Sequence, residues 1–303
     1  MDGIINVYKE KGYTSHDVVA KMRGILRMKK IGHTGTLDPE AEGVLPVCLG
    51  KGTKLCDALT DKTKEYRAVL LLGKETDTQD ITGRVLTEHP VESSEAMEQA
   101  VREAVMSFVG PYLQVPPMYS ALKVNGKKLY ELARAGKEVE RQPRPVEIFK
   151  IRIESICLPR VTMTVACSKG TYIRTLCHDI GKKAGCGGCM ESLIRTRVDR
   201  FVIEESLRLD EIESLRDLEE LSRHVLPVDS VFESLPRLSM AAGGEGDKLV
   251  HNGNPFRPEL TESGDLFFEA RVYDSGGCFI GVYEYDEKKK RYQPRKLFLG
   301  GAS

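Results

Sequence analysis

The stretch GHTGTLDPEAEGVLP, residues 32–46, decides how this chain is interpreted. Its three glycines permit backbone conformations and close approaches that other residues resist. Pro39 has a fixed φ angle and biases Asp38, before it, toward an extended conformation. An Asp-Pro turn between glycines is also a common structural turn. The concentration of polar and special backbone residues nevertheless predicts an active-site loop in which the Asp38 carboxylate is held in place.

The chain has 303 residues, of which 41% are hydrophobic, so it can form one large domain or two unequal domains with real cores. No apolar run is long enough to cross a bilayer, and the N-terminus MDGIINVYKEKGY has no signal-peptide pattern. The eight cysteines are scattered, which favours reduced thiols over a disulfide framework. These features predict a cytoplasmic enzyme.

The formal net charge is zero, but the charges are segregated along the chain. Residues 111–200 hold 17 Lys and Arg against 8 Asp and Glu, whereas residues 204–233 hold 3 against 10. Screening limits the reach of the acidic segment to about 10 Å, so a basic face can still attract RNA. Ordinary solvated surface is the alternative interpretation of these charges.

Hydrophobic spacing predicts alternating strands and helices in the first three quarters of the chain. Thr14 and Asp17 form a capping-box pattern that opens a helix. The acidic amphipathic segment 206–223 is expected to be one helix that seals this part of the chain. The other expected elements are strands at residues 3–8, 66–72 and 161–167, and helices at 93–110 and from 171 onward.

The composition changes after residue 234. Residues 241–246 are predicted to be a Gly-rich linker, followed by strands near 266–273 and 278–285. We therefore expect an α+β protein with two domains, residues 1–233 and 234–303, the second small and rich in β-structure.

A zinc site is the second interpretation of the cysteines. Cys186 and Cys189 form a CxxC pair, and Cys177 and His178 lie upstream. A single CxxC lacks the second knuckle of most structural zinc sites, so no metal is expected.

Five stretches, in order, resemble the bacterial tRNA pseudouridine-55 synthases of the TruB family. They are KGYTS (11–15), the loop at 32–46, KEYRAVLLLGKETDTQDITG (64–83), PPMYSALKVNGKKLYELAR (116–134) and CSKGTYIRTLCHDIG (167–181). The resemblance implies a catalytic domain built on a mixed, mainly antiparallel sheet flanked by helices, and a C-terminal PUA domain. One departure is that Glu10 follows Lys9, where the family usually has proline.

The same resemblance implies the roles of particular side chains. Asp38 matches the nucleophile, Arg174 its ion-pair partner, and Tyr66 the tyrosine that lies against the base and handles the C5 proton. Whether the nucleophile attacks C6 of the base or C1′ of the sugar stays open. The implied substrate contacts are His33, which takes the space vacated by the flipped base, together with Tyr172, Leu193 and Lys9.

The segment 114–145 is basic and ends in prolines, and it resembles the family's RNA-clamping insertion. Lys123, Lys127 and Lys128 would contact phosphates without reading sequence. The resemblance therefore implies a monomeric enzyme that converts uridine 55 in the tRNA T-arm, without cofactor or guide RNA. The alternative is an RNA-binding or tRNA-folding protein without catalysis, which would share the basic faces but would not need a restrained Asp38.

Overall fold

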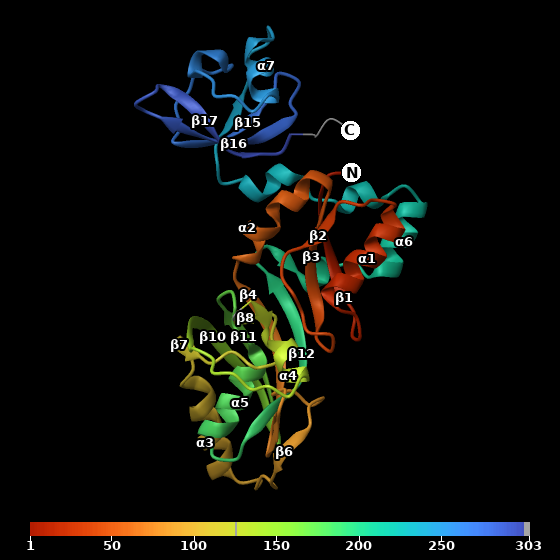
Figure 1. Ribbon diagram of the computed structural model, residues 1–303, viewed down its shortest axis with the longest axis vertical. Coiled ribbons are helices and arrows are strands. Elements are labelled where there is room, and N and C mark those ends of the chain that lie inside the picture. Colours follow the sequence, from red (N-terminus) through yellow and green to blue (C-terminus); the bar gives the residue numbers. More distant parts are fainter. Residues whose placement is uncertain (125, 300–303) are drawn as a thin grey trace.

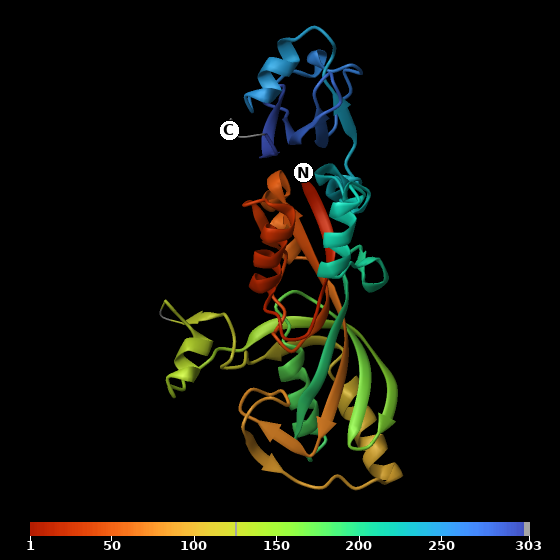
Figure 2. The same ribbon diagram turned by 90° about the vertical axis from the view of Figure 1, so that its right-hand side faces the viewer.

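The computed structural model describes residues 1–124 and 126–299, and it has the predicted α+β architecture (Figure 1). A large mixed sheet runs through the body of the molecule, and a separate four-stranded sheet lies at one end (Figures 1 and 2). No helix in the described part of the chain is long and apolar enough to span a membrane.

The large sheet has nine strands, with β1-β3-β12-β4-β11-β10-β7 as its main order. Its pairings are antiparallel except for β3 and β12, which run parallel, so the expected mixed, mainly antiparallel sheet is confirmed. Short strands β2 and β13 pair with β3 and β12. The bounds are β1 (Gly3–Lys9), β2 (Ile31–His33), β3 (Glu42–Leu49), β4 (Lys64–Leu72), β7 (Gly110–Gln114), β10 (Arg144–Cys157), β11 (Arg160–Cys167), β12 (Gly188–Val198) and β13 (Phe201–Val202).

One half of the sheet is covered by α1 (Ser15–Leu26) and α6 (Leu209–Asp217). The predicted capping box is present, because Asp17 N donates to Thr14 Oγ1 at 3.0 Å and Thr14 N donates to the Asp17 carboxylate at 2.8 Å. Val18 and Met22 of α1 then pack on Ile5 of β1 in a closed apolar cluster. The helix therefore places its N-terminus beside the 32–46 loop.

The other half of the sheet is covered by α3 (Glu95–Met106) and α5 (Ile173–Lys183). Leu176 and Ile180 of α5 are buried against the strands, as their helical spacing predicts. Helix α5 follows β11 after the turn at residues 168–172. The hairpin of β5 (Lys74–Thr76) and β6 (Val85–Glu88) extends from β4.

The segment between β7 and β10 forms an arm that projects from the body (Figure 2). It contains β8 (Lys123–Val124), β9 (Lys127–Lys128) and α4 (Leu129–Arg134). The position of this arm agrees with the excursion expected at residues 114–145. Short helices elsewhere are α2 (Cys56–Thr60), η1 (Gly50–Leu55), η2 (Ile203–Glu205), η3 (Leu221–His224) and η4 (Val228–Phe232).

The C-terminal sheet has the order β14-β15-β16-β17 and its own apolar core. Phe279 and Phe298 pack against Leu55 and Phe232, and the Tyr273 hydroxyl donates to Asp229 at 2.6 Å. These contacts join the small sheet to the body. Its elements are β14 (Arg237–Ser239), β15 (Glu269–Tyr273), β16 (Phe279–Asp286), β17 (Arg291–Leu297), α7 (Glu245–His251) and η5 (Pro258–Leu260).

Two predictions made from the sequence are wrong. The acidic helix ends at Asp217 because Glu219 takes a left-handed conformation with φ 60°, and Leu218 is 70% exposed instead of packing on the core. The Gly-rich stretch at 241–246 is not a linker. It connects β14 to α7 inside the small sheet unit, and its last residue, Gly246, is buried in the first turn of α7.

Candidate active site

Lys9 holds the loop that carries Asp38. Its side chain is completely buried, and its ammonium donates to the carbonyls of Glu10, Pro39 and Ala41. Burial lowers the pKa of Lys9 to about 8. An ammonium has three donors, so none remains for RNA. The substrate contact expected of Lys9 does not fit this placement, and its structural role is to hold the backbone that follows Asp38 against the first turn.

The loop has further anchors. Leu37 N donates to Ser15 Oγ at 2.9 Å, and Gly12 N donates to the Pro39 carbonyl at 2.9 Å. Glu10, which replaces the usual proline, pairs with Arg208 at 2.8 Å. This exposed ion pair ties the first turn to the start of α6.

Gly43 is required where the loop returns to β3. Its φ is +103°, and a Cβ atom there would lie 2.3 Å from the Arg195 carbonyl oxygen on β12. Real Cβ atoms do not approach backbone that closely, so only glycine allows β3 and β12 to meet behind Asp38.

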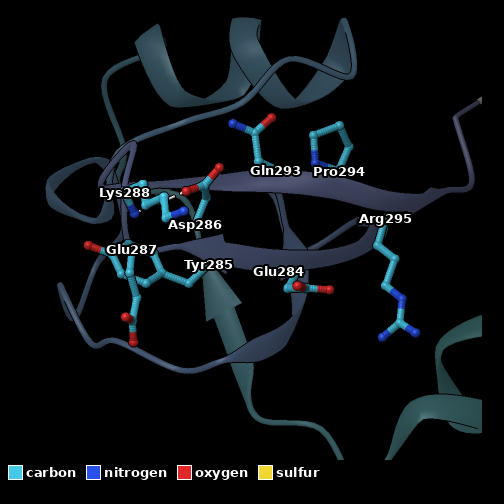
Figure 3. A pocket seen from close by; sticks show the side chains of 8 residues that line it. All are labelled: Glu284, Tyr285, Asp286, Glu287, Lys288, Gln293, Pro294 and Arg295. Carbon is cyan, nitrogen blue, oxygen red and sulfur yellow. Dashed lines mark hydrogen bonds between the residues drawn. The ribbon is translucent and has the colours of Figure 1, made fainter.

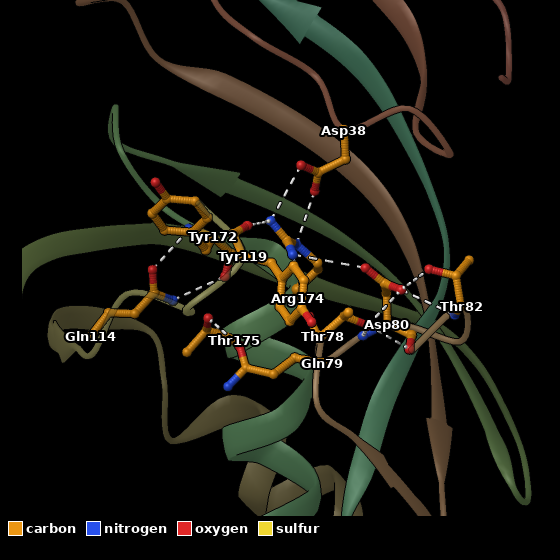
Figure 4. Close-up of polar contacts among 10 residues, drawn as sticks. All are labelled: Asp38, Thr78, Gln79, Asp80, Thr82, Gln114, Tyr119, Tyr172, Arg174 and Thr175. Carbon is orange, nitrogen blue, oxygen red and sulfur yellow. Dashed lines mark hydrogen bonds and ion pairs between the residues drawn. The ribbon is translucent and has the colours of Figure 1, made fainter. Parts of the chain in front are cut away.

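Asp38 and Arg174 form an ion pair across the site (Figure 4). Arg174 Nε lies 2.9 Å from Asp38 Oδ2, and Nη2 lies 3.2 Å from Oδ1. The Arg174 side chain is 5% exposed and that of Asp38 is 39% exposed. The carboxylate therefore has a cation on one side and an open approach on the other.

Burial raises the pKa of the Asp38 carboxyl, and the Arg174 guanidinium opposes that rise. Arg174 lies in the first turn of α5, where the helix dipole disfavours a cation. The Asp38 carboxylate offsets this unfavourable interaction. The alternative that Arg174 is a surface residue is excluded by its burial.

Arg174 also contacts two other segments (Figure 4). Its guanidinium donates to the carbonyls of Tyr119 at 3.0 Å and Thr78 at 3.3 Å, and it lies 3.8 Å from the Asp80 carboxylate. Asp80 itself accepts hydrogen bonds from Thr78 and Thr82, as expected of a turn-capping residue. One side chain thus joins the loop, the arm and the turn before β6.

Tyr66 lies on β4 and is 8% exposed, within the same apolar cluster as Leu37 and Leu193. Burial raises the pKa of the Tyr66 phenol, and the Arg195 guanidinium opposes that rise. Leu193 on β12 is 7% exposed and faces Ala68 across the sheet. The strand pairing therefore brings Tyr66 and Leu193 to the wall beside Asp38.

Tyr172 is held through its backbone by Gln114 (Figure 4). Tyr172 N donates to Gln114 Oε1 at 2.8 Å, and Gln114 Nε2 donates to the Tyr172 carbonyl at 3.0 Å. Gln114 is 1% exposed and stands where the arm leaves the sheet. The arm is therefore attached directly to the residue before the turn that carries Arg174.

His33 ends β2, at the entrance to the loop. Its ring meets that of His16 edge to face at 5.2 Å, and its Nδ1 accepts from Gly35 N at 3.3 Å. Burial lowers the pKa of His33 to about 4, and neighbouring His16 adds to the effect. His33 is therefore uncharged at neutral pH.

The three lysines of the arm lie away from the ion pair. Lys123 and Lys127 are exposed on the β8-β9 hairpin, and Lys128 is half-buried, with its Nζ 3.3 Å from the Tyr130 hydroxyl. The arm therefore presents Lys123 and Lys127 to solvent.

The cysteines expected as the alternative metal ligands lie in different surroundings. Cys177 is buried in the core, and His178 Nδ1 lies 3.7 Å from Glu75. Among residues 1–124 and 126–299, no group of three or more His, Cys, Asp or Glu is arranged to hold a metal.

A shallow pocket, drawn in Figure 3, lies on β16 and β17 between Glu284 and Arg295, in the C-terminal sheet.

Two residues of this centre were missed in the sequence. Arg195 stands two positions after Leu193 on the same strand, so strand alternation placed it on the same inward face. That signal could have found it. Gln114 carried no comparable signal, since it marked only the start of the basic segment.

Structural comparison defines the class of this fold. The chain superposes on the protein titled "Crystal Structure of a Cbf5-Nop10-Gar1 Complex" with a TM-score of 0.70 and 25% identity, covering 98% of this chain and 85% of that one. It also matches "Structure of H/ACA RNP bound to a substrate RNA containing 2'-deoxyuridine" with a TM-score of 0.68, 23% identity and the same coverage. Together with the family match given next, these superpositions identify the fold as that of the pseudouridine synthases.

Sequence comparison defines the family. Residues 23–173 match the TruB family pseudouridylate synthase N-terminal domain, and residues 174–233 match the tRNA pseudouridylate synthase B C-terminal domain. The chain is 54% identical to tRNA pseudouridine synthase B of Lachnoclostridium phytofermentans, over 99% of this chain and all of that protein. It is 44% identical to the protein of that name from Clostridium kluyveri, over 99% and 100% of the two chains. The chain belongs to the TruB family of pseudouridylate synthases.

Proposed function

We propose that this protein isomerises the uridine at position 55, in the T-loop of tRNA, to pseudouridine, with Asp38 as the nucleophile. The observation that carries the proposal is the Asp38–Arg174 ion pair, 2.9 Å long, whose cation is buried and whose carboxylate is reachable. The most similar relatives described above are named tRNA pseudouridine synthase B, which supports tRNA as the substrate.

The reaction breaks the N1–C1′ bond, turns the base and forms a C5–C1′ bond, with no change of oxidation state. It needs a nucleophilic carboxylate, a cation that keeps this carboxylate ionised, and a group that receives the C5 proton. Asp38, Arg174 and Tyr66 supply these groups on one side of the sheet. Attack at C6 and attack at C1′ both start from the same ionised Asp38.

The uridine must leave its stack to reach Asp38, because the target base is held within the folded T-loop of the RNA. His33 is uncharged at neutral pH, so its ring can occupy an apolar, stacked position without carrying a charge out of water. Leu193 and Tyr172 line the side of the site where the flipped base would rest.

Binding of the tRNA T-arm is assigned to the projecting arm and its lysines. Phosphate contacts position an RNA without reading its sequence, and the T-arm is recognised by its shape. The small C-terminal sheet unit, residues 234–303, is proposed to be a PUA-like RNA-binding domain attached to a catalytic domain of residues 1–233. The enzyme is proposed to act without a guide RNA, since the arm supplies basic contacts from the same chain. It is also proposed to be a cytoplasmic monomer that needs no cofactor.

The test follows the C5 hydrogen, which is lost when C5–H becomes C5–C1′. Purified protein, with chelator and no added cofactor, is mixed with unmodified tRNA that carries tritium at C5 of its uridines. We expect about one tritium per tRNA to be released, from the T-loop, and the same release from an isolated T-arm stem-loop.

The matched control is Asp38→Asn, which keeps the shape of the side chain and is expected to release none. A protein that only binds or folds tRNA would release no tritium even with Asp38 intact. Release from many uridines would contradict the assignment of a single position. A requirement for zinc or a guide RNA would exclude the stand-alone enzyme.

A further inference from the structure

Arg195, on β12, is a buried cation that the mechanism above does not use. It is 1% exposed, and in the described part of the chain no carboxylate lies within ion-pair distance of its guanidinium. Removing a charge from water without a counter-charge is costly, and buried arginines are usually paired with carboxylates. An unpaired buried arginine beside a catalytic centre therefore indicates that an anion forms next to it during the reaction.

Two of its contacts hold the loop that carries Asp38. Arg195 Nε donates to the Val44 carbonyl at 2.7 Å, and Nη2 donates to the Gly35 carbonyl at 3.3 Å. These acceptors lie on either side of the Asp38 turn. They fix the guanidinium in place, but a neutral carbonyl does not balance its charge.

The third neighbour is Tyr66. Arg195 and Tyr66 are direct partners in the antiparallel β4-β12 register, where side chains of opposed residues lie about 4.5–5.5 Å apart at Cβ. Both side chains are buried, Arg195 at 1% and Tyr66 at 8% exposed. Tyr66 is thus the only group in this set of contacts that can become an anion.

We propose that Arg195 is the positioning residue that stabilises Tyr66 as a phenolate, so that this side chain can take the C5 proton. The proposal rests on the proposed function, because it assumes that Tyr66 receives this proton. In the step, the C5–H bond breaks and its proton passes to Tyr66 Oη, while its electron pair forms the C5–C6 double bond. C6 in turn releases a bonding pair: that of its bond to Asp38, which leaves as carboxylate, if attack was at C6, or that of its π bond to N1 if attack was at C1′. Tyr66 reaches the phenolate state beforehand by losing its own proton to solvent, and it returns the C5 proton there afterward.

Three groups face Tyr66 from the elements packed on it. Burial is the largest influence and raises the pKa of Tyr66; among the facing groups, Arg195 of β12 favours the phenolate, while Cys167 of β11 and Asp38 of the loop oppose it. Burial raises the pKa of the Cys167 thiol to about 12, so this group is uncharged at neutral pH. The balance of charge at Tyr66 therefore depends on Arg195 against Asp38.

The test compares Arg195→Gln, which removes the charge but keeps an N–H donor, with Arg195→Lys, which keeps the charge but loses the planar fork. The ionisation of Tyr66 is followed by the absorbance difference between each protein and the same protein carrying Tyr66→Phe. We expect Arg195→Gln to raise the pKa of Tyr66 by about 1–3 units, the usual effect of losing a neighbouring opposite charge. Arg195→Lys should leave it near the wild-type value.

Single-turnover tritium release is then measured against pH for the same proteins. At a pH below the pKa of Tyr66 in both the wild-type protein and Arg195→Gln, each unit by which that pKa is raised lowers the phenolate fraction tenfold. Arg195→Gln should therefore slow tritium release by about 10- to 1,000-fold, and raising the pH should recover the rate. A loss of the same factor at every pH, with the ionisation of Tyr66 unchanged, would show that Arg195 only braces the loop and would overturn the inference.

Folding of each variant is checked by its T-arm binding. If Arg195→Gln does not fold, Arg195→Lys decides: an increase in the pKa of Tyr66 despite the retained charge overturns the inference. Full activity of Tyr66→Phe would also overturn it. These failures differ from those of the proposed function, which fails if the wild-type protein releases no tritium, releases it from many uridines, or requires zinc or a guide RNA.

Discussion

Replacing Gly43 with alanine should damage the site without touching any group that reacts. Two costs combine at this position. A left-handed φ costs about 1–2 kcal/mol for a residue with a Cβ atom. The new Cβ would also lie 2.3 Å from the Arg195 oxygen and 3.0 Å from the backbone carbon and nitrogen of that residue, so β3 and β12 would have to separate. Overpacking of this kind costs about 1–3 kcal/mol.

Gly110→Ala is the matched control. Gly110 has a φ of +108°, close to the +103° of Gly43, but nothing lies within 4 Å of the position of its Cβ. It should therefore show only the cost of backbone strain. We expect Gly43→Ala to lower the free energy of unfolding by about 2–5 kcal/mol and Gly110→Ala by about 1–2 kcal/mol.

Urea denaturation of the two variants measures the difference, and tritium release shows its effect on the site. Gly43→Ala should reduce turnover while binding of the T-arm is retained. Gly43 lies on β3, which continues the loop that carries Asp38, at the point where β3 pairs with β12. Equal destabilisation by the two substitutions would refute the argument that the close approach of β12 requires glycine at position 43.

Further predictions concern the ion pair and the arm. Asp38→Asn should abolish turnover and leave tRNA binding within a few-fold, and residual activity above a tenth of the wild-type rate would remove Asp38 from the role of nucleophile. Arg174→Lys keeps the charge but loses the planar fork that contacts Asp38 and two carbonyls, so a large loss of turnover is expected, and unchanged single-turnover rates would contradict it. Burial raises the pKa of Asp38, and only its ionised form is nucleophilic, so the pH–rate profile should fall on acidification at a pH above the ordinary aspartate pKa of about 3.9; an unshifted acid limb would argue against this. Neutralising Lys123, Lys127 and Lys128 together should weaken binding of all T-arm substrates alike and reduce the salt dependence of affinity, and an unaltered salt slope would show that the arm does not touch phosphates.

Elements defined by local sequence were predictable. The Thr14 capping box, the strand at 66–72 and the amphipathic stripe of α5 each depend on residues within a few positions of one another. The same was not true of the end of α6. Leu218 continued the helical spacing of apolar residues, but the left-handed turn at Glu219 ended the helix and left Leu218 in solvent.

Lys9 shows a second limit. The sequence places a lysine after an apolar strand, where a solvent-exposed cation is the usual outcome. Its burial follows from three carbonyls, two of them thirty or more positions away, that converge only when the 32–46 loop folds back over the end of β1. Spacing along the chain carries no information about that convergence.

The sequence by itself determined the loop that carries Asp38, several of the strands and helices, and the family. Tertiary structure decided which charges face one another. Asp38 and Arg174 are 136 positions apart, and Tyr66 and Arg195 meet only through the β4-β12 register. The physical reason is that local conformation depends on near neighbours, whereas the charge state of a buried group depends on desolvation and on partners that only the packed sheet brings within a few ångströms.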